Sequence, residues 1–538
     1  MAKKIVKQKS IKKEDDIFNY VIDAFVFLIL CLFPLFVTDR YYNILQSKYY
    51  FYIGSVVFLF IALAIAGILN ARKIESYFSE FHWNGFLKKL TVTDWALITF
   101  LIIAALSTIL SDYVYESFWG NEGRFSGLFL LCLYGGAYFG VTRFGKFRRW
   151  YLDAFLVFSM LVCLFGISDY FQMDLLKFKV GMLEEQKFMF TSTIGNINTY
   201  TALVGMIVAV STVLYSIEKE KKKIIFYYIC MVIGFFAIIT GISDNAYLSL
   251  AALFGLSPLY LFKDKSGIRR YLIIIATFFS VIQCIDWINI NMAERVLEID
   301  SAFRIIVNYS GLLYIVIGLW LVTALTYLVD YLNKRKKGIS DYKESTSVGV
   351  RIAWLIIIFV IICGGIFLLF DVNVNGNTER YGVISNYLLF NDDWGTHRGY
   401  IWRNAMESFH AFSPLKKLFG FGPDTFGIVL LDKTKGNVYG ELFDNAHNEY
   451  LHYLITVGIL GLAAYLTYLV SFVVRCIRIG RSNPCVIAAM MAVICYSTQA
   501  FVNLNLPIAT PIMWLMLTLG VLGCSGNGQV KDVGIEEI

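Results

Sequence analysis

The run Ile352–Asp371, IAWLIIIFVIICGGIFLLFD, decides the fold of this chain. It has no charged residue before its final aspartate, and its length matches the roughly 20 apolar residues that a helix needs to cross a bilayer core of about 30 Å. Similar runs recur along the sequence. The 538 residues are 58% hydrophobic and only 16% charged, whereas a soluble globular chain is about a quarter charged. These values predict an all-α, polytopic transmembrane helix bundle and argue strongly against a large soluble helical protein.

Fourteen apolar segments are predicted to cross the membrane: approximately 17–38, 49–70, 93–111, 126–143, 151–170, 196–216, 224–241, 245–262, 271–289, 308–331, 352–371, 447–474, 484–504 and 507–524. The predicted organisation is a cytoplasmic N-terminal tail (1–16), spans 1 to 11 (17–371), an extracytoplasmic loop (372–446), spans 12 to 14 (447–524) and a cytoplasmic C-terminal tail (525–538). The first apolar run has the length of a spanning helix, so we expect it to stay in the mature protein.

The basic residues favour one orientation of these spans. With the N-terminus inside, most of the 47 Lys and Arg residues fall in inner segments, as the positive-inside rule expects. An even number of spans then places both termini in the cytoplasm of a multi-pass protein of the cell membrane. The net charge of +7 therefore reflects topology, and no nucleic-acid partner is expected.

No residue cluster predicts a metal site. The ten cysteines lie in apolar runs or at their ends, and none forms a C-x-x-C pair, so we interpret them as small buried hydrophobic residues. Asp392 and Asp393 are adjacent carboxylates, but no histidine or further acid at ligand spacing accompanies them. We expect them to form a solvated loop surface.

The long predicted outer loop spans about 75 residues, which is typical of a functional or a disordered segment. Within it, the segment 396–412, THRGYIWRNAMESFHAF, has apolar residues at helical spacing: Ile401, Trp402, Ala405, Met406 and Phe409. Thr396 is a candidate N-cap and Pro414 a candidate stop. We expect an amphipathic helix that lies on the membrane surface or caps the bundle.

Arginine, asparagine and aromatic residues collect in the predicted outer segments. Arginine forks match phosphate oxygens in pairs, and aromatic rings and amides suit sugar faces and hydroxyls. Singly, each residue has a plainer interpretation as a helix cap, an interfacial aromatic or a snorkelling cation. Together they favour a ligand that bears both phosphate and sugar. The candidate substrate-binding residues are Asn121 and Arg124 (118–127, FWGNEGRFSG), Asn196 and Tyr200 (192–200, STIGNINTY), Asn245 (240–247, TGISDNAY), Trp402, Arg403, and Asn448 and Tyr450 (444–450, DNAHNEY).

Two of the five histidines stand at the start of predicted span 12. His447 lies just before this span, where it could reach a substrate at the membrane surface, and an ordinary pKa near 6.5 suits a general base. His452 is five residues further on and points about 140° away on an ideal helix. We therefore expect His447 to be catalytic and His452 to be structural.

The order of these residues resembles the O-antigen ligase/polymerase superfamily. The match consists of Arg398, Trp402, Ala405, Pro414, Gly420, Gly422 and Phe426, then Ala446, His447, Asn448, Tyr450 and Leu451, then Gly458, Gly461 and Leu462. The motifs around 120–127 and 195–200 look like earlier outer motifs of the family, so the resemblance covers about residues 115–475. The element A-H-N-x-Y-L after a long outer loop is its most specific part.

The resemblance implies a GT-C-like membrane glycosyltransferase of cell-envelope polysaccharide or glycoconjugate assembly. Its donor would be a glycan on undecaprenyl diphosphate, and its acceptor a hydroxyl of a glycan, lipid or protein at the outer membrane surface. The family implies inverting displacement with no cofactor and no metal. In that mechanism His447 takes the acceptor proton or orients the acceptor, and Arg398, with Arg124, holds the diphosphate.

The sequence departs from the family at one position. Family members often carry Ser-Arg after the seventh span, whereas this chain reads Ser243-Asp244-Asn245. Either Arg124 or Arg304 substitutes for the absent arginine, or the donor differs, or catalysis is impaired.

Three alternatives stay open beside a ligase. A polymerase of the same superfamily shares all these motifs and differs in its acceptor. A lipid-linked glycan flippase or another transporter is disfavoured, because the span interiors are almost free of charge and the unusual residues collect on one face. A non-catalytic assembly protein is supported by the missing arginine.

Overall fold

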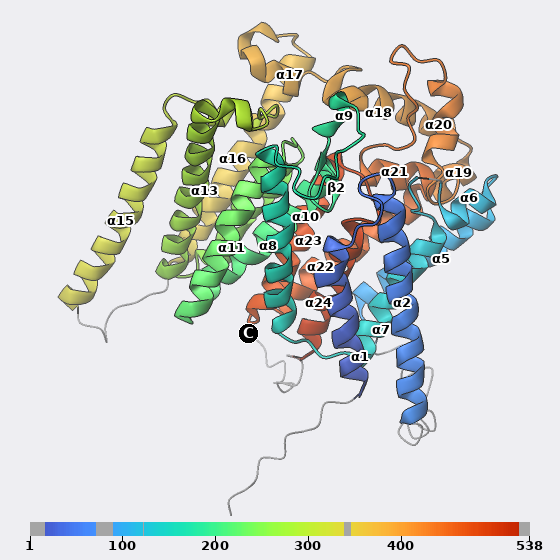
Figure 1. Cartoon of the computed structure of the whole chain (residues 1–538), viewed down its shortest axis with the longest axis horizontal. Helices are drawn as coiled ribbons and strands as arrows, with labels where there is room; N and C mark the ends of the chain where they lie inside the picture. The colour runs from blue at the N-terminus through green and yellow to red at the C-terminus, as the bar shows by residue number, and fades with distance from the viewer. Residues whose placement is uncertain (1–16, 71–89, 122, 338–345, 527–538) are drawn as a thin grey trace, which may run out of the picture.

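The computed structural model of this chain describes residues 17–70, 90–121, 123–337 and 346–526. Nearly all regular structure in these residues is helical (Figure 1). The exception is one short antiparallel pair, β1 (Phe190–Thr191) and β2 (Gly195–Asn196). The predicted all-α helix bundle is therefore confirmed.

Within the described residues, eleven helical segments are long and apolar enough to cross a membrane. They are α1–η1–η2 (Ile17–Phe27, Leu28–Leu32, Phe33–Leu35), α2 (Ile44–Leu69), α5 (Val92–Ile109), α8 (Trp150–Tyr170), α10 (Ile197–Ile217), α11 (Lys221–Thr240), α13 (Lys265–Asn291), α15 (Leu312–Lys337), α16 (Val348–Asn373), α22 (Gly458–Arg478) and α23–η5 (Pro484–Gln499, Ala500–Val502). Three shorter apolar helices are α7 (Leu128–Phe144), α12 (Ala246–Leu261) and α24 (Thr510–Gly526). These fourteen helices overlap the fourteen predicted segments. The multi-pass architecture is confirmed, whereas the exact number of crossings stays a prediction, because a 17-residue helix is only about 25 Å long.

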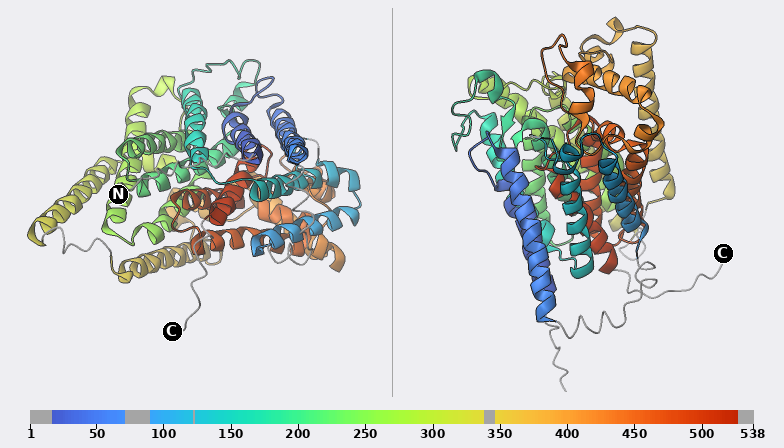
Figure 2. Two further views of the ribbon diagram at one scale, coloured as in Figure 1. Left: turned by 90° about the horizontal axis from the view of Figure 1, so that it is seen from below. Right: turned by 90° about the vertical axis from the view of Figure 1, so that its right-hand side faces the viewer.

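Helix α10 lies at the centre of the bundle. Almost all of its side chains are buried, and it packs against α11, α12 and α23. An apolar helix without a polar face is stable only when other helices surround it, so this helix forms the core. By contrast, α16 packs loosely on α12, where Trp354 Nε1 donates a hydrogen bond to Gly255 O (2.8 Å). Figure 2 shows α15 at one edge of an elongated layer and the α5–α6 region at the other (α6, Val114–Trp119).

The helix ends divide between two faces of the bundle. In Figure 1 the N-terminal end of α1, the C-terminal end of α2 and the C-terminal end of α15 point downward. The helices of the long loop lie on the opposite, upper face, as does the short helix α9 (Glu184–Lys187). We call this upper face the loop face. The predicted outer segments share the loop face, which agrees with the alternation of spans.

The long loop is folded over the bundle. Its elements are η4 (Glu379–Ile384), α17 (Ser385–Leu388), α18 (Trp394–Ala411), α19 (Pro414–Phe419) and α20 (Phe426–Thr434), and they are followed by α21 (Glu449–Thr456). The loop has a small hydrophobic core of its own, to which α18 contributes Ile401 and Ala405, and α20 contributes Phe426 and Leu430. The predicted amphipathic helix is thus present as α18. Its apolar residues pack against those of α20 and α21.

The start of α18 differs from the prediction at Thr396. Gly395, Thr396 and His397 all have positive φ values (62°, 59° and 67°), so regular helix begins only after this turn. Thr396 therefore does not occupy the N-cap conformation. At the other end the helix stops at Ala411, before Pro414, which starts α19 with Ser413 as its N-cap.

The predicted span 447–474 is divided into two helices, α21 and α22. The break lies at Gly458, whose φ is +72°. A Cβ at Gly458 would clash with the backbone of Leu418 in α19, and a Cβ at Gly420 would clash with the backbone of Thr456. Two glycines thus allow α19 to lie against the α21–α22 junction, so α21 belongs to the loop face and α22 is the helix with spanning length.

Candidate functional site

His447 lies in the turn that leads into α21. Its backbone N–H donates to Asn445 Oδ1 (2.9 Å), and its φ of +47° is left-handed. The same turn is held from α18, because Trp402 Nε1 donates to Ala446 O (2.8 Å). An Asx-type turn and an indole N–H therefore fix the backbone on both sides of the imidazole. Trp402, a candidate substrate-binding residue, is placed here as a support for the His447 turn.

The charges around His447 come from two loops, the loop that carries Arg124 and the long loop that carries Arg398 and Asp444. Burial, and then the positive charges of Arg398 and Arg124, lower the pKa of His447 to about 3, whereas Asp444 opposes this shift. The imidazole is therefore neutral at pH 7 and keeps a nitrogen lone pair. The structure thus brings together the two predicted catalytic residues, His447 and Arg398, and one predicted substrate-binding residue, Arg124.

Arg398 presents N–H groups that no acceptor in the described ranges uses. Its Nη1 donates to Gly395 O (3.0 Å), but its buried Nε has no hydrogen-bond partner in the described part of the chain. No carboxylate of the described residues forms an ion pair with this guanidinium within 4.0 Å. Burial lowers the pKa of Arg398, and the negative charge of Asp244 acts against it. A guanidinium stays charged in proteins, so Arg398 is suited to bind an anion.

The two arginines considered as substitutes for the missing family arginine, Arg124 and Arg304, have protein partners. Arg124 makes a bidentate pair with Asp444, at 2.8 Å from Nε to Oδ2 and 2.6 Å from Nη2 to Oδ1. Arg304 lies 3.4 Å from Glu298 and is more than half exposed. Arg398 lies within electrostatic reach of Asp244, where the family pattern lacks its arginine.

Asp424 organises the floor of the site. Its Oδ2 accepts hydrogen bonds from the backbone N–H groups of Asn121 (2.8 Å) and Ser126 (2.9 Å) and so closes the turn that carries Arg124. Burial raises the pKa of Asp424 to about 7. We did not predict a role for this residue from the sequence. The available signal is an acid directly after the glycine-rich turn Gly420–Pro423.

His452 is buried beneath this floor. Its Nε2 lies 4.0 Å from Asp424 Oδ1, its Nδ1 lies 3.4 Å from Asn445 Nδ2, and its ring stacks on Phe426 with centroids 5.6 Å apart. Burial lowers the pKa of His452 to about 4. Because Asn445 also binds the backbone of His447, the buried histidine supports the candidate catalytic turn from below.

The Ser243–Asn245 segment joins the loop face to the helix bundle. Ser243 Oγ donates to Asn198 Oδ1 (2.7 Å), and Asn503 Nδ2 donates to Asn198 O (3.0 Å). Asp244 Oδ1 accepts from the backbone N–H of Ala302 (2.7 Å). Asn245 is buried, and its Nδ2 has no hydrogen-bond partner in the described residues.

Asn196 and Tyr200 lie apart from the His447–Arg398 cluster. Asn196 caps α10 by accepting hydrogen bonds from Asn198 N (2.9 Å) and Thr199 N (3.4 Å). Tyr200 is only 1% exposed and packs against Gly166 of α8. Asn196 thus starts α10, and Tyr200 fills the contact between α10 and α8, so neither side chain faces the cluster.

Arg403, Asn448 and Tyr450 also have structural contacts. Arg403 makes a bidentate pair with Asp392 (2.9 and 2.7 Å) on the exposed side of α18, five residues from Arg398. Asn448 caps α21 by accepting from Tyr450 N (3.0 Å). The hydroxyl of Tyr450 donates to Ser497 O (2.5 Å) on α23. We predicted that these three residues bind substrate, but in the structure their side chains bind other groups of the protein.

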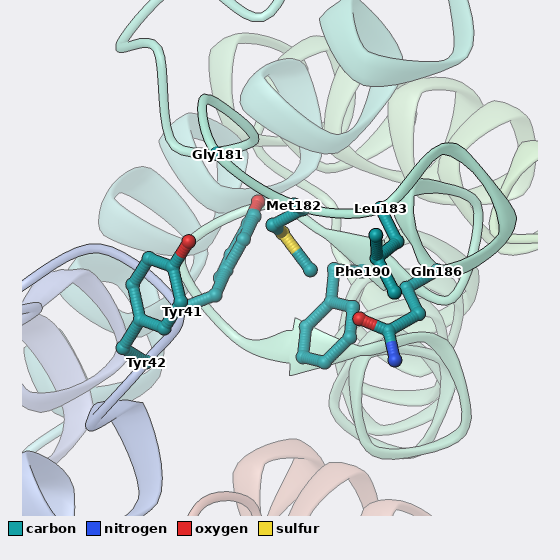
Figure 3. A pocket seen from close by; sticks show the side chains of 7 residues that line it. All are labelled: Tyr41, Tyr42, Gly181, Met182, Leu183, Gln186 and Phe190. Carbon is teal, nitrogen blue, oxygen red and sulfur yellow. The ribbon is translucent and has the colours of Figure 1, made fainter.

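A separate hollow opens on the loop face (Figure 3). Tyr41 and Tyr42 form one wall, and Met182, Gln186 and Phe190 face them. None of the predicted site residues lines this hollow. Within the described residues, no group of three or more His, Cys, Asp and Glu side chains could hold a metal ion.

The fold and this cluster define a class: a multi-pass α-helical membrane protein in which a folded loop holds histidine and arginine against one end of the bundle. Within this class, residues 299–466 match the family model described as O-antigen ligase. The matched segment contains Arg398, His447 and the whole loop, and it confirms the resemblance to the O-antigen ligase superfamily. No curated protein matches the chain. The family supports a membrane glycan-transfer function of the ligase type.

Proposed function

We propose that this protein transfers a glycan from undecaprenyl diphosphate to a hydroxyl acceptor at the outer surface of the cell membrane. The observation that carries the proposal is the pairing of a neutral imidazole with an arginine that forms no ion pair, and whose Nε has no acceptor, within the described residues. Arg398 supplies donors for diphosphate oxygens, and His447 supplies a proton acceptor beside them. A phosphate-bearing donor and a hydroxyl acceptor require these two kinds of group.

In the proposed reaction the acceptor oxygen forms a bond to the anomeric carbon while the bond from this carbon to the phosphate oxygen breaks. The configuration inverts, the proton of the acceptor hydroxyl passes to His447, and the diphosphate leaves with the electron pair. The developing charge on the diphosphate is met by Arg398. The low pKa of His447 in the absence of donor makes it a weak base, but a bound diphosphate offsets the nearby positive charges and raises that pKa. Donor binding therefore activates the base.

Two substitutions test the proposal. In purified protein with a lipid-linked donor, we expect His447→Ala to lower the transfer rate by about 10²–10⁴-fold, the usual contribution of a general base. Arg398→Ala should lower it by about 10²–10³-fold, the usual contribution of one preorganised donor to developing charge. Both variants should reach the membrane in normal amounts, because neither side chain supports the bundle.

Arg403→Ala is the matched control, since it removes a guanidinium from the same helix. Its partner is the surface residue Asp392, so we expect nearly unchanged transfer. Full activity in both His447→Ala and Arg398→Ala would refute the proposed site.

A chelator should leave transfer unchanged if the reaction is metal-independent, as we propose. A polymerase of the same superfamily would give products that lengthen by whole glycan units, whereas a ligase gives a single transfer to another acceptor.

A further inference from the structure

Two hollows on the loop face share Tyr41 and Tyr42. The first is the hollow of Figure 3, with a volume of about 270 Å³. The second, also about 270 Å³, is lined by the same tyrosines and by Gln46, Gly123 and Phe125. We call the two together the tyrosine groove. Its walls come from the loop before α2, the loop that carries Arg124 and the loop between α8 and α10.

The lining of the tyrosine groove is aromatic, amide and apolar, and no charged side chain lines either hollow. Tyr42 is 59% exposed. The exposed amides of Gln46 and Gln186 make no hydrogen bond within the described residues. The exposed ring of Tyr42 beside glutamine side-chain donors and acceptors matches a neutral pyranose, which has apolar C–H faces and a rim of hydroxyl or acetamido groups. A diphosphate, in contrast, would require cations.

The groove reaches the candidate catalytic cluster at the Arg124 turn. Gly123 and Phe125 line its end, and Arg124 between them forks to Asp444 beside His447. Phe125 stacks on Tyr49 with ring centroids 4.7 Å apart, which keeps this end of the groove in place. The groove therefore ends at the turn that carries Arg124, whose charge acts on His447.

The walls are held by contacts between distant loops. Tyr41 Oη donates to Ser192 O (2.8 Å), and Arg40 Nη1 donates to Val180 O (3.2 Å). Tyr41 also packs on Phe190 with ring centroids 5.3 Å apart. A groove that is already formed loses little conformational entropy when a ligand binds.

We propose that the tyrosine groove is a saccharide subsite that holds sugar residues beyond the one that reacts. This inference rests on the proposed glycan transfer and identifies the part of the chain that would recognise the length of the glycan. Tyr42 would stack on a sugar face, and Gln186 would hydrogen bond to its hydroxyl or acetamido groups.

The test compares Tyr42→Ala and Gln186→Ala with wild-type protein. The probes are undecaprenyl diphosphate carrying one sugar, and the complete undecaprenyl-linked glycan that accumulates in cells lacking this protein. For the complete glycan we expect each variant to raise KM by up to about tenfold and to leave kcat within about twofold, because one lost ring contact or one lost hydrogen bond is worth at most about 1.4 kcal/mol. For the one-sugar donor both constants should match wild type. A second arm varies the acceptor glycan, and the arm in which KM changes identifies which substrate occupies the groove.

Tyr115→Ala is the control, because Tyr115 on α6 is 73% exposed and lies outside both hollows. An unchanged KM for every long glycan, donor and acceptor, would overturn the subsite, as would an equal loss with the one-sugar donor. Different results would refute the proposed function itself: wild-type protein that transfers no glycan, or a His447→Ala variant that transfers glycan as fast as wild type.

Discussion

At the scale of single residues, the site depends on how three charges surround one imidazole. Burial, and then Arg398 and Arg124, lower the pKa of His447, and Asp444 partly compensates. The same arrangement couples the two halves of the proposed reaction, since the anion that neutralises the arginines also makes the histidine a better base. An isolated histidine at a membrane surface would instead titrate near its ordinary pKa of about 6.5.

This coupling can be measured without turnover. In protein with labelled histidines, we expect the His447 resonance not to titrate between pH 5 and 8, because a pKa lowered to about 3 keeps the ring neutral throughout. Inorganic pyrophosphate should then move the midpoint upward. The resonance that disappears in His447→Ala gives the assignment. A midpoint near 6.5 without pyrophosphate would contradict the proposed environment.

Asp424 provides a second test at this scale. Asp424→Asn keeps an oxygen that can accept from both Asn121 N and Ser126 N, whereas Asp424→Ala leaves both N–H groups without this acceptor. Each buried N–H left unpaired costs roughly 1–3 kcal/mol. We expect Asp424→Ala to lower both the free energy of unfolding and the transfer rate, and Asp424→Asn to retain most of each. Thermal unfolding of the purified protein is the measurement, and equal effects of the two variants would count against this role.

At the scale of elements, the decisive feature is the break between α21 and α22. A continuous helix over 447–474 would carry His447 and His452 on one axis with the spanning residues. Instead Gly458 turns the chain, Gly420 lets α19 approach it, and Gly422 N donates to Thr456 O (2.8 Å). The short helix α21 can therefore pack under α18 and α20. The position of His447 relative to Arg398 follows from this packing.

Gly458→Ala tests the break, with Gly364→Ala as the matched control. At Gly458 an alanine meets the backbone of Leu418 and must adopt a left-handed φ, so we expect loss of both stability and transfer. At Gly364, in the middle of α16, nothing lies within 4 Å of the added Cβ. This alanine should be neutral or stabilising by about 0.5–1 kcal/mol. Similar melting temperatures for the two variants would show that the close approach does not matter.

At the scale of the whole molecule, the bundle separates two faces of different composition. The loop face carries the histidine–arginine cluster and the tyrosine groove, and the helix ends α1, α2 and α15 lie on the opposite face (Figure 1). We propose that the loop face is extracytoplasmic, in accordance with the distribution of basic residues. The proposed glycan transfer then takes place on the outer surface of the membrane.

Thiol labelling tests this orientation. Val438 is 91% exposed in the loop, so Val438→Cys should react with an impermeant thiol reagent in intact cells. Glu220, at the α10–α11 connection on the opposite face, is the control position: Glu220→Cys should react only after permeabilisation. Wild-type protein corrects for labelling of the native cysteines. The reverse pattern of reactivity would invert the topology.

Composition and apolar run length were sufficient to predict the membrane bundle, because the bilayer requires about 20 apolar residues per helix whatever the neighbours are. Helical spacing predicted α18, and a short motif drew attention to the segment with His447, because both signals are local properties of the sequence. Tertiary structure alone decided which polar residues meet. Arg398 and Arg403 lie five residues apart in α18, yet Arg403 pairs with Asp392, whereas Arg398 pairs with no carboxylate of the described residues. Asp424 supports the site from another turn altogether. The physical reason is that one turn of helix, one left-handed glycine or one surface carboxylate changes the partner of a side chain. Such contacts join residues far apart in the sequence, so a local pattern does not predict them.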